Sequence, residues 1–204
     1  MILNDNDIRE VLAKMKPPKQ AAQIKSPKDV RQMVVDAFHD DSFEKQGYPI
    51  HLINSQHAIR FRHSEVTIWC GENSTGKSEM LNQFILSQTD VEKSFVMSPE
   101  MPLYRTVQYM AQQATGVSKP SIVQIDKFLE SVNDKIFLLD QQSTFTPQDI
   151  LSLIRYVHEE HGCFHFVIDS LMKCGVDEME SAKIKWFVDQ LCVIAKNLKI
   201  HIHL

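Results

Sequence analysis

The chain has 204 residues, of which 43% are hydrophobic and 24% are charged, and this balance excludes a disordered or collagen-like protein. The 22 Lys and Arg residues against 26 Asp and Glu residues give a net charge of -4, which argues against a strongly basic surface that holds nucleic acid by itself. The N-terminus carries charge where a signal peptide would be apolar, and no apolar run is long enough to cross a membrane. We therefore expect a soluble, cytoplasmic protein.

The first 33 residues differ in pattern from the rest of the chain. Apolar residues at helical spacing predict an amphipathic helix near residues 5–16, which stops at Pro17 and Pro18. The segment that follows is predicted to be a mobile basic linker or a solvated connector, because one acid, Asp29, accompanies the basic residues Lys14, Lys16, Lys19, Lys25, Lys28 and Arg31. A second helix is predicted over residues 30–38. We expect a linker region at 1–33 and an ATP-binding domain at 34–204.

From about residue 64 onward, short apolar runs alternate with longer helical periodicities, which is typical of parallel strands joined by crossover helices. Strands are predicted at residues 66–70, 94–97, 135–140, 164–169 and 200–204. The helices predicted between them are KSEMLNQFILSQ, PLYRTVQYMAQQ, SIVQIDKFLESV, TPQDILSLIRYVHEEHG and SAKIKWFVDQLCVIAKNLK. The fourth has Thr146 as its N-cap, Pro147 at its first position and Gly162 just past its end. The pattern predicts an α/β fold with a parallel sheet of about five strands flanked by helices.

One segment carries a motif with a specific chemistry, G-x-x-x-x-G-K-[ST], directly after the predicted strand 66–70 and directly before a helix. In such a loop, successive backbone N–H groups wrap a phosphate at a helix N-terminus, and glycine is needed where a side chain would block the approach. A lysine then supplies a cation for the β- and γ-phosphates, and a serine hydroxyl binds Mg²⁺. A glycine turn that only joins a strand to a helix is the weaker alternative. The residues predicted to bind ATP and Mg²⁺ are Gly71, Glu72, Asn73, Ser74, Thr75, Gly76, Lys77 and Ser78.

Two acids follow predicted strands at the edge where a parallel sheet binds its ligands. Asp169 ends the run 164–169 and is a candidate to orient Mg²⁺ through water, although a strand-end aspartate can also cap the next turn. Glu100 lies in the turn Ser-Pro-Glu-Met-Pro and is the best placed acid to polarise the attacking water. An exposed glutamate at a helix start is the alternative for Glu100. Asp140 is a similar but weaker candidate.

The histidines predict little chemistry. His158 and His161 lie three residues apart near the end of a predicted helix, where histidine complements the helix dipole, and no third metal ligand is obvious. His201 and His203 share one face of the last predicted strand, and we expect that face to be unburied.

The cysteines show no CxxC spacing, so the sequence predicts neither a disulfide framework nor a zinc site. Cys70 and Cys192 lie in apolar segments, where a small buried thiol is expected. Arg60 and Arg62, ahead of the first predicted strand, could meet a nucleotide or could simply be solvated.

Taken together, several motifs resemble the RecA-like motor domain of hexameric replicative DNA helicases, a family that includes the bacterial replicative helicase, the phage primase-helicases and mitochondrial Twinkle. The resemblance covers roughly residues 45–204. The phosphate loop alone is shared by many nucleotidases, whereas the Ser-Pro-Glu-Met-Pro turn in this position is more particular. The segments that carry it are GENSTGKS, MSPEMP, LLDQQSTFTPQDI, FVIDSLMKCG and AKNLKIHIHL.

The resemblance implies that Lys77 and Ser78 bind the ATP phosphates and magnesium, that Glu100 activates water, and that Asp169 supports the metal. It also implies a homo-oligomeric ring in which the helix near residues 5–16 packs on a neighbour, and single-stranded DNA as a partner of the full-length protein. In the family, the DNA-contacting loops and an arginine that reaches the neighbour's site follow the strand that matches IHIHL. Because these would lie beyond Leu204, we expect the chain as given to bind Mg-ATP but to hydrolyse it slowly.

Two other functions stay open from the sequence. One is a RecA-like regulatory or recombination ATPase without helicase activity. The other is a non-catalytic domain whose nucleotide only stabilises an interface.

Overall fold

The computed structural model describes residues 25–39, 47–49, 60–72, 75–99, 101–140, 144–169, 174–175 and 181–204. The chain divides into two units, residues 1–46 and 47–204, which are considered separately. In the first unit, helix α2 (Arg31–His39) takes the place of the helix predicted over residues 30–38, and its apolar residues Met33 and Phe38 are exposed. The helix predicted near residues 5–16 lies outside the described residues.

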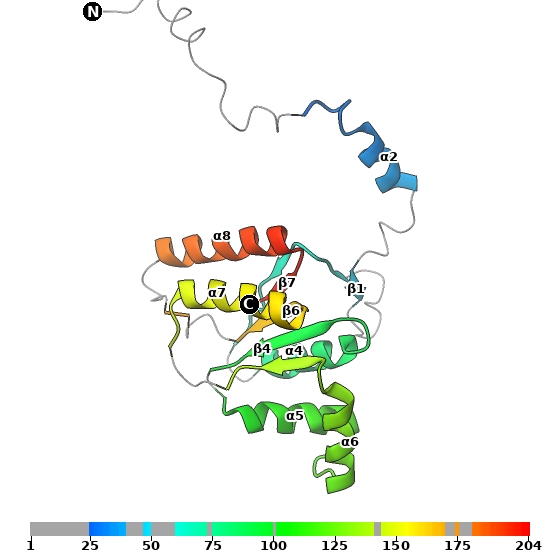
Figure 1. The fold of residues 1–204 in the computed structure, drawn as a ribbon, viewed down its shortest axis with the longest axis vertical. Coiled ribbons are helices and arrows are strands. Elements are labelled where there is room, and N and C mark those ends of the chain that lie inside the picture. Colours follow the sequence, from blue (N-terminus) through cyan, green and yellow to red (C-terminus); the bar gives the residue numbers. More distant parts are fainter. Residues whose placement is uncertain are drawn as a thin grey trace, which may run out of the picture. The chain divides into compact units, whose positions relative to one another are not determined.

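The second unit is built on a five-stranded parallel sheet (Figure 1). Its strands, in spatial order, are β3 (Val66–Thr67), β7 (His201–His203), β6 (Cys163–Ile168), β4 (Lys93–Met97) and β5 (Ile136–Leu138). Every neighbouring pair is parallel, so the carboxyl ends of all five strands meet at one edge of the sheet. The predicted strand count, strand positions and parallel sheet are confirmed.

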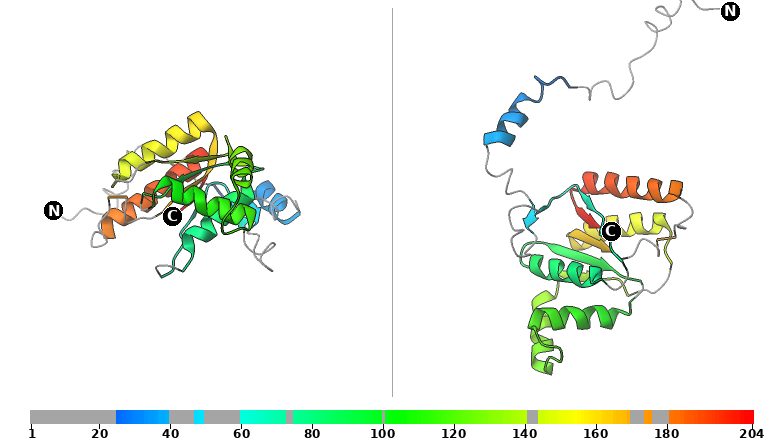
Figure 2. Two further views of the ribbon diagram at one scale, coloured as in Figure 1. Left: turned by 90° about the horizontal axis from the view of Figure 1, so that it is seen from below. Right: turned by 180° about the vertical axis from the view of Figure 1, so that it is seen from behind.

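Helices cover both faces of the sheet. The helices are α4 (Lys77–Gln88), α5 (Leu103–Thr115), α6 (Ile122–Val132), α7 (Pro147–His161) and α8 (Ser181–Leu198). Helices α7 and α8 lie on one face, and α4 and α5 lie on the other (Figures 1 and 2). Successive strand residues point to opposite faces, so Phe95 and Phe166 pack with the α7 and α8 residues, while Val96 and Val167 pack with α4 and α5.

Helix α7 begins and ends as the sequence predicts. The Thr146 hydroxyl accepts a hydrogen bond from the Asp149 backbone N–H (3.2 Å), and the Asp149 carboxylate accepts one from the Thr146 backbone N–H (3.0 Å). This reciprocal pair satisfies two helix-end donors that have no partner within the helix. Gly162 ends the helix with a positive φ of 68°, which glycine adopts without steric cost.

Replacing Thr146 with alanine is expected to lower the free energy of unfolding by about 1 kcal/mol, because one backbone donor of α7 loses its acceptor. Denaturant unfolding followed by circular dichroism measures the change. Replacing the exposed Gln148, in the first turn of the same helix, with alanine is the matched control, and an equal loss in both variants would contradict a capping role.

A small second sheet, which the sequence did not predict, pairs β1 (Tyr48–Pro49) with β2 (Arg60–Phe61) in antiparallel register. Phe61 is 4% exposed and packs edge-on against Phe84 of α4 and against the rings of His201 and His203. The expectation that His201 and His203 lie on an unburied face is therefore wrong. Both are 0% exposed, because β2 and α4 together cover the face of β7 from which they project.

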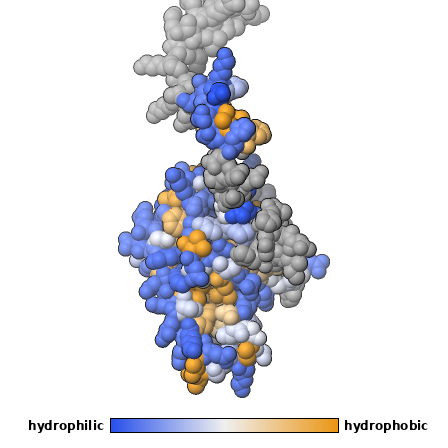
Figure 3. All heavy atoms as spheres, turned by 90° about the vertical axis from the view of Figure 1, so that its right-hand side faces the viewer, coloured by the Kyte–Doolittle hydropathy of each residue, from blue (hydrophilic) through white to orange (hydrophobic). Residues whose placement is uncertain are grey.

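The surface also carries exposed apolar side chains over α5 and α6. Tyr104, Ile122 and Val123 are among them, and apolar surface gathers over this region in Figure 3. Among the described helices, none is both long and apolar enough to span a membrane.

The cysteines are distributed differently from the expectation. Cys70 is exposed and Cys192 is half-buried, whereas Cys163 and Cys174 are buried. Cys70 is exposed because β3 ends at Thr67 and the chain has already left the sheet toward the phosphate loop. Burial raises the pKa of the Cys163 and Cys174 thiols to about 12, so both stay protonated at neutral pH. All four thiols are free, in agreement with the absence of a disulfide framework in the sequence pattern.

Candidate nucleotide-binding site

The predicted phosphate loop connects β3 to α4 at the carboxyl edge of the sheet. Its root is held beside β7, because the Trp69 backbone N–H donates to the Leu204 carbonyl (2.7 Å) and the Leu204 N–H donates to the Thr67 carbonyl (2.9 Å). Gly76 precedes α4 with φ 90° and ψ 21°, a left-handed conformation that favours glycine. Of the eight predicted loop residues, Asn73 and Ser74 lie outside the described residues.

The loop residues on both sides of that gap are joined by hydrogen bonds. The Lys77 ammonium donates to the carbonyl oxygens of Gly71 (2.7 Å) and Glu72 (2.8 Å). The Thr75 hydroxyl donates to the same Glu72 carbonyl (2.8 Å). A Cβ added at Gly71 would lie 3.0 Å from the Thr75 hydroxyl oxygen, so this position is tight for any side chain. The loop thus closes into a compact turn with a cation at its mouth.

Helix α4 begins at Lys77 with its N-terminus directed at this turn. Its N-cap, Gly76, provides no side-chain hydrogen bond. The first backbone N–H groups of a helix lack partners within the helix and carry the positive end of its dipole. A helix start of this kind, beside a lysine, is suited to an anion such as a phosphate.

Ser78 and Asp169 meet across the two elements that the sequence links to magnesium. The Ser78 hydroxyl on α4 donates to the carboxylate of Asp169, which follows β6, over 2.7 Å and in a partly buried setting. The two residues are 91 positions apart in the chain. Both offer hard oxygen atoms, the ligand type that Mg²⁺ prefers, so their donor chemistry fits this ion.

The predicted water-activating residue, Glu100, lies outside the described residues, but its flanking residues are placed. Ser98 and Met101 line a small pocket together with Ser78 and Asp169. The Asp169 backbone N–H also donates to the Met97 carbonyl over 2.9 Å. The ends of β4 and β6, and therefore the turn that holds residue 100, adjoin the phosphate loop at the same sheet edge.

Other residues singled out in the sequence are not brought to this site. The His158 ring Nδ1 contacts the Cys163 carbonyl (2.9 Å) at the start of β6, and His161 stacks on Phe137 with ring centroids 4.4 Å apart. Both therefore lie near the amino ends of the strands, away from Asp169. Within the described part of the chain, no cluster of three or more histidine, cysteine or acidic side chains is arranged to hold a metal ion.

The arginines of the β2 region serve local contacts. The Arg60 guanidinium donates to the Gly47 carbonyl (2.6 Å) across the small sheet, and Arg62 lies 4.0 Å from Glu65 with both side chains nearly half exposed. Asp140 is exposed at the end of β5.

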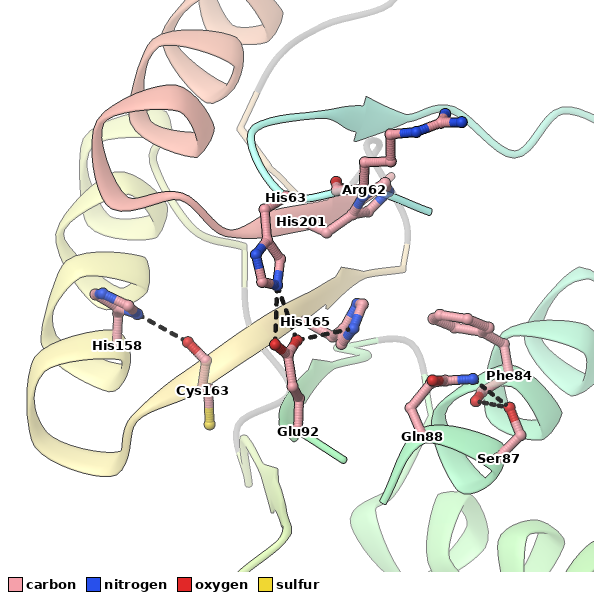
Figure 4. Close-up of polar contacts among 10 residues, drawn as sticks. All are labelled: Arg62, His63, Phe84, Ser87, Gln88, Glu92, His158, Cys163, His165 and His201. Carbon is pink, nitrogen blue, oxygen red and sulfur yellow. Dashed lines mark hydrogen bonds and ion pairs between the residues drawn. The ribbon is translucent and has the colours of Figure 1, made fainter. Parts of the chain in front are cut away.

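A buried polar cluster, which the sequence patterns did not predict, lies at the amino end of the sheet. The Glu92 carboxylate contacts His63 (2.9 Å) and His165 (3.3 Å), as Figure 4 shows. Burial alone would raise the pKa of Glu92, but hydrogen bonds from His165, Tyr48 and His63 hold it down to about 2. Burial and the Glu92 carboxylate raise the pKa of Tyr48. The signal in the sequence was the alternation of His165 with the apolar residues of its strand, which places this ring on the face that α4 covers.

Comparison with known proteins supports the fold but supplies no sequence relative. The sequence matches no protein-family model, and no curated protein matches it. Among solved structures, the ATPase domain of a helicase superposes with a TM-score of 0.66 at 12% identity, covering 88% of this chain and 70% of that one. A DnaB-like replicative helicase, solved in a study of its interactions with primase, gives a TM-score of 0.72 at 13% identity and covers 97% and 51%. The fold is RecA-like.

The same RecA-like fold also occurs in a further neighbour. A KaiC-like protein from the archaeon Pyrococcus horikoshii superposes with a TM-score of 0.56 at 20% identity, covering 78% of this chain and 67% of that one. The chain therefore spans about half the length of the DnaB-like helicase that it resembles. These neighbours are ATPase domains or proteins of the same architecture, and at such low identity the likeness concerns the fold.

Proposed function

We propose that this chain is the ATP-binding and hydrolysing motor domain of a replicative DNA helicase. In the full-length protein it forms a homo-oligomeric, hexameric ring, and hydrolysis drives translocation on single-stranded DNA. The observation that carries the proposal is the 2.7 Å hydrogen bond between Ser78 and Asp169. It joins the end of the phosphate-loop motif to the acid of the neighbouring strand tip, on a fold shared with helicase ATPase domains.

The proposed chemistry is in-line attack of water on the γ-phosphate. The loop N–H groups and the α4 N-terminus bind the phosphate oxygens, and the Lys77 ammonium lies over the β- and γ-phosphates. The Ser78 hydroxyl and the Asp169 carboxylate hold Mg²⁺, which when bound offsets the negative charge of the phosphates. Glu100 orients the attacking water and accepts its proton. Each role places a group where transition-state charge develops.

Mg-ATP at about one hundred times its dissociation constant is expected to stabilise the folded protein by about 3 kcal/mol. Lys77→Ala removes a charge-assisted contact to phosphate and is expected to weaken binding at least about tenfold. Thermal melting with and without nucleotide measures both effects. Lys127→Ala, an exposed lysine on α6, is the matched control. Equal melting shifts in the wild type and Lys77→Ala would refute the phosphate site.

A RecA-like regulatory or recombination ATPase is the second candidate, favoured by the likeness to the KaiC-like protein. Stimulation of ATP turnover by single-stranded DNA in the full-length protein separates the two. Stimulation supports the helicase motor, whereas turnover that ignores DNA but responds to a protein partner supports the regulatory ATPase.

A further inference from the structure

The root of the phosphate loop is tied to the sheet through a side chain as well as through the backbone. The indole Nε1 of Trp69 donates to Nδ1 of His203 over 3.3 Å. Trp69 lies two residues before Gly71, the first residue of the phosphate-loop motif, and His203 is fully buried on β7. The hydrogen bond therefore connects the entrance of the loop to the rigid interior of the sheet.

The His203 ring also touches the element that follows the loop. Its centroid lies 4.9 Å from the Phe84 ring, which belongs to α4, the helix that begins at Lys77. Phe61 meets it edge-on, also at 4.9 Å. A single buried imidazole thus contacts Trp69 before the loop and Phe84 after it, in a layer covered by β2.

The contact with Trp69 fixes the protonation state of His203. An indole N–H can only donate, so Nδ1 of His203 must accept and the ring must be neutral with its hydrogen on Nε2. The other titratable groups that face the ring are His201, with centroids 4.5 Å apart, and His165 at 5.7 Å. The further charged groups of this layer, His63 and Glu92, reach it through His165.

The described groups around His203 favour this neutral form. Burial, followed by the charges of His201 and His165, holds the pKa of His203 well below 6.5. The accepting form is therefore the stable one at neutral pH, and protonation would place a second hydrogen against the indole N–H.

We propose that His203 is a positioning residue for nucleotide binding, whose neutral imidazole anchors Trp69 and thereby orders the phosphate loop. The inference rests on the proposed function, because the loop matters as the binding site for the ATP phosphates. It assigns His203 no contact with the nucleotide. Its action is transmitted through Trp69 on one side and Phe84 on the other.

The test compares variants that remove the bond with one that keeps it. His203→Leu and Trp69→Phe each delete one partner, whereas His203→Asn retains an oxygen acceptor at a similar position. Hydrogen exchange of the amides in residues 70–78, measured without nucleotide, reports the order of the loop. Both deletions are expected to speed this exchange and to weaken Mg-ATP binding by about three- to tenfold. The double variant should be no worse than the poorer single one, and His203→Asn should stay close to the wild type.

Tryptophan fluorescence gives a second readout. The chain has two tryptophans, and Trp186→Phe removes the one on α8, which is 42% exposed and serves as the control for Trp69→Phe. In that background, Trp69 emission is expected to stay constant from about pH 8 to pH 6 and to change only at lower pH. A transition centred near 6.5, the pKa of an ordinary histidine, would overturn the inference.

Two results would show that His203 only fills space. One is a lower melting temperature for His203→Leu with unchanged loop exchange and unchanged nucleotide affinity. The other is an identical loss in His203→Asn and His203→Leu. If the wild type binds no Mg-ATP, the proposed function fails by itself. The exchange and fluorescence measurements then still decide whether His203 orders the loop.

Discussion

Replacing Glu100 with glutamine is expected to remove most ATP hydrolysis while leaving Mg-ATP binding within about twofold. Glutamine has nearly the shape of glutamate but cannot accept a proton from the attacking water. A positioned general base contributes about 10²- to 10⁴-fold to such a step, so we expect a loss of this size in the rate of the chemical step. Single-turnover hydrolysis, with protein in excess over ATP, measures that rate, and calorimetry measures binding.

Glu130→Gln provides the control, because Glu130 is an exposed carboxylate on α6 and its loss should leave the rate unchanged. Wild-type turnover in Glu100→Gln would show that another group orients the water. A wild-type protein that binds Mg-ATP and never hydrolyses it would instead support a non-catalytic, nucleotide-stabilised interaction domain. Glu100 would then have no effect on either quantity.

Stability is expected to fall steeply as the pH drops from about 6.5 to 4. Burial lowers the pKa of His201 to about 4, helped by the charges of His165 and His63 and opposed by its hydrogen bond to the Arg62 carbonyl. An unfolded histidine takes up a proton near pH 6.5. Between these values the unfolded chain binds a proton that the folded chain does not, so the free energy of unfolding decreases by about 3 kcal/mol for His201 alone.

Other groups of the layer act in the same direction. The pKa of His203 is lowered further, so its share continues to grow as the pH falls. The carboxylate of Glu92, with its pKa lowered to about 2, adds a loss that begins below about pH 4.5, where the unfolded glutamate becomes protonated. Acid therefore weakens the packing among β2, α4 and β7 through two kinds of group.

Denaturant unfolding at a series of pH values measures this dependence. His201→Gln keeps a polar side chain that does not titrate, and its unfolding free energy should change less between pH 6.5 and 4 than that of the wild type. Replacing the half-buried His161 with glutamine on α7 is the matched control. A wild-type stability that stays flat across this range would contradict neutral, buried histidines.

Much of the fold follows from patterns that are local in the sequence. The apolar runs and the helical periodicities between them predict the five parallel strands, and the Thr146, Pro147 and Gly162 signals predict the ends of α7. The small sheet of β1 and β2 could not be predicted, because each strand has only two residues. Strands of that length produce no alternating pattern, and their pairing depends on what they cover.

The candidate site shows the same division. The motif predicts the phosphate loop because its chemistry is contained in eight consecutive residues. The contact between Ser78 and Asp169 follows only once β6 is known to end beside α4. His201 and His203 were misinterpreted because polarity in a strand usually marks a solvent face. Here each ring nitrogen that is bonded finds its partner in a distant segment, such as Thr67 for His201 and Trp69 for His203.

The hydrogen bonds of Lys77 bear on the strength of nucleotide binding. Its ammonium already donates to two carbonyl oxygens of its own loop, and an ammonium has three donors in all. An arriving triphosphate must therefore compete with main-chain acceptors for the same cation, and every bond it gains is offset by one given up. Affinity here is an exchange between internal and external acceptors, and it should rise with any change that weakens the internal ones.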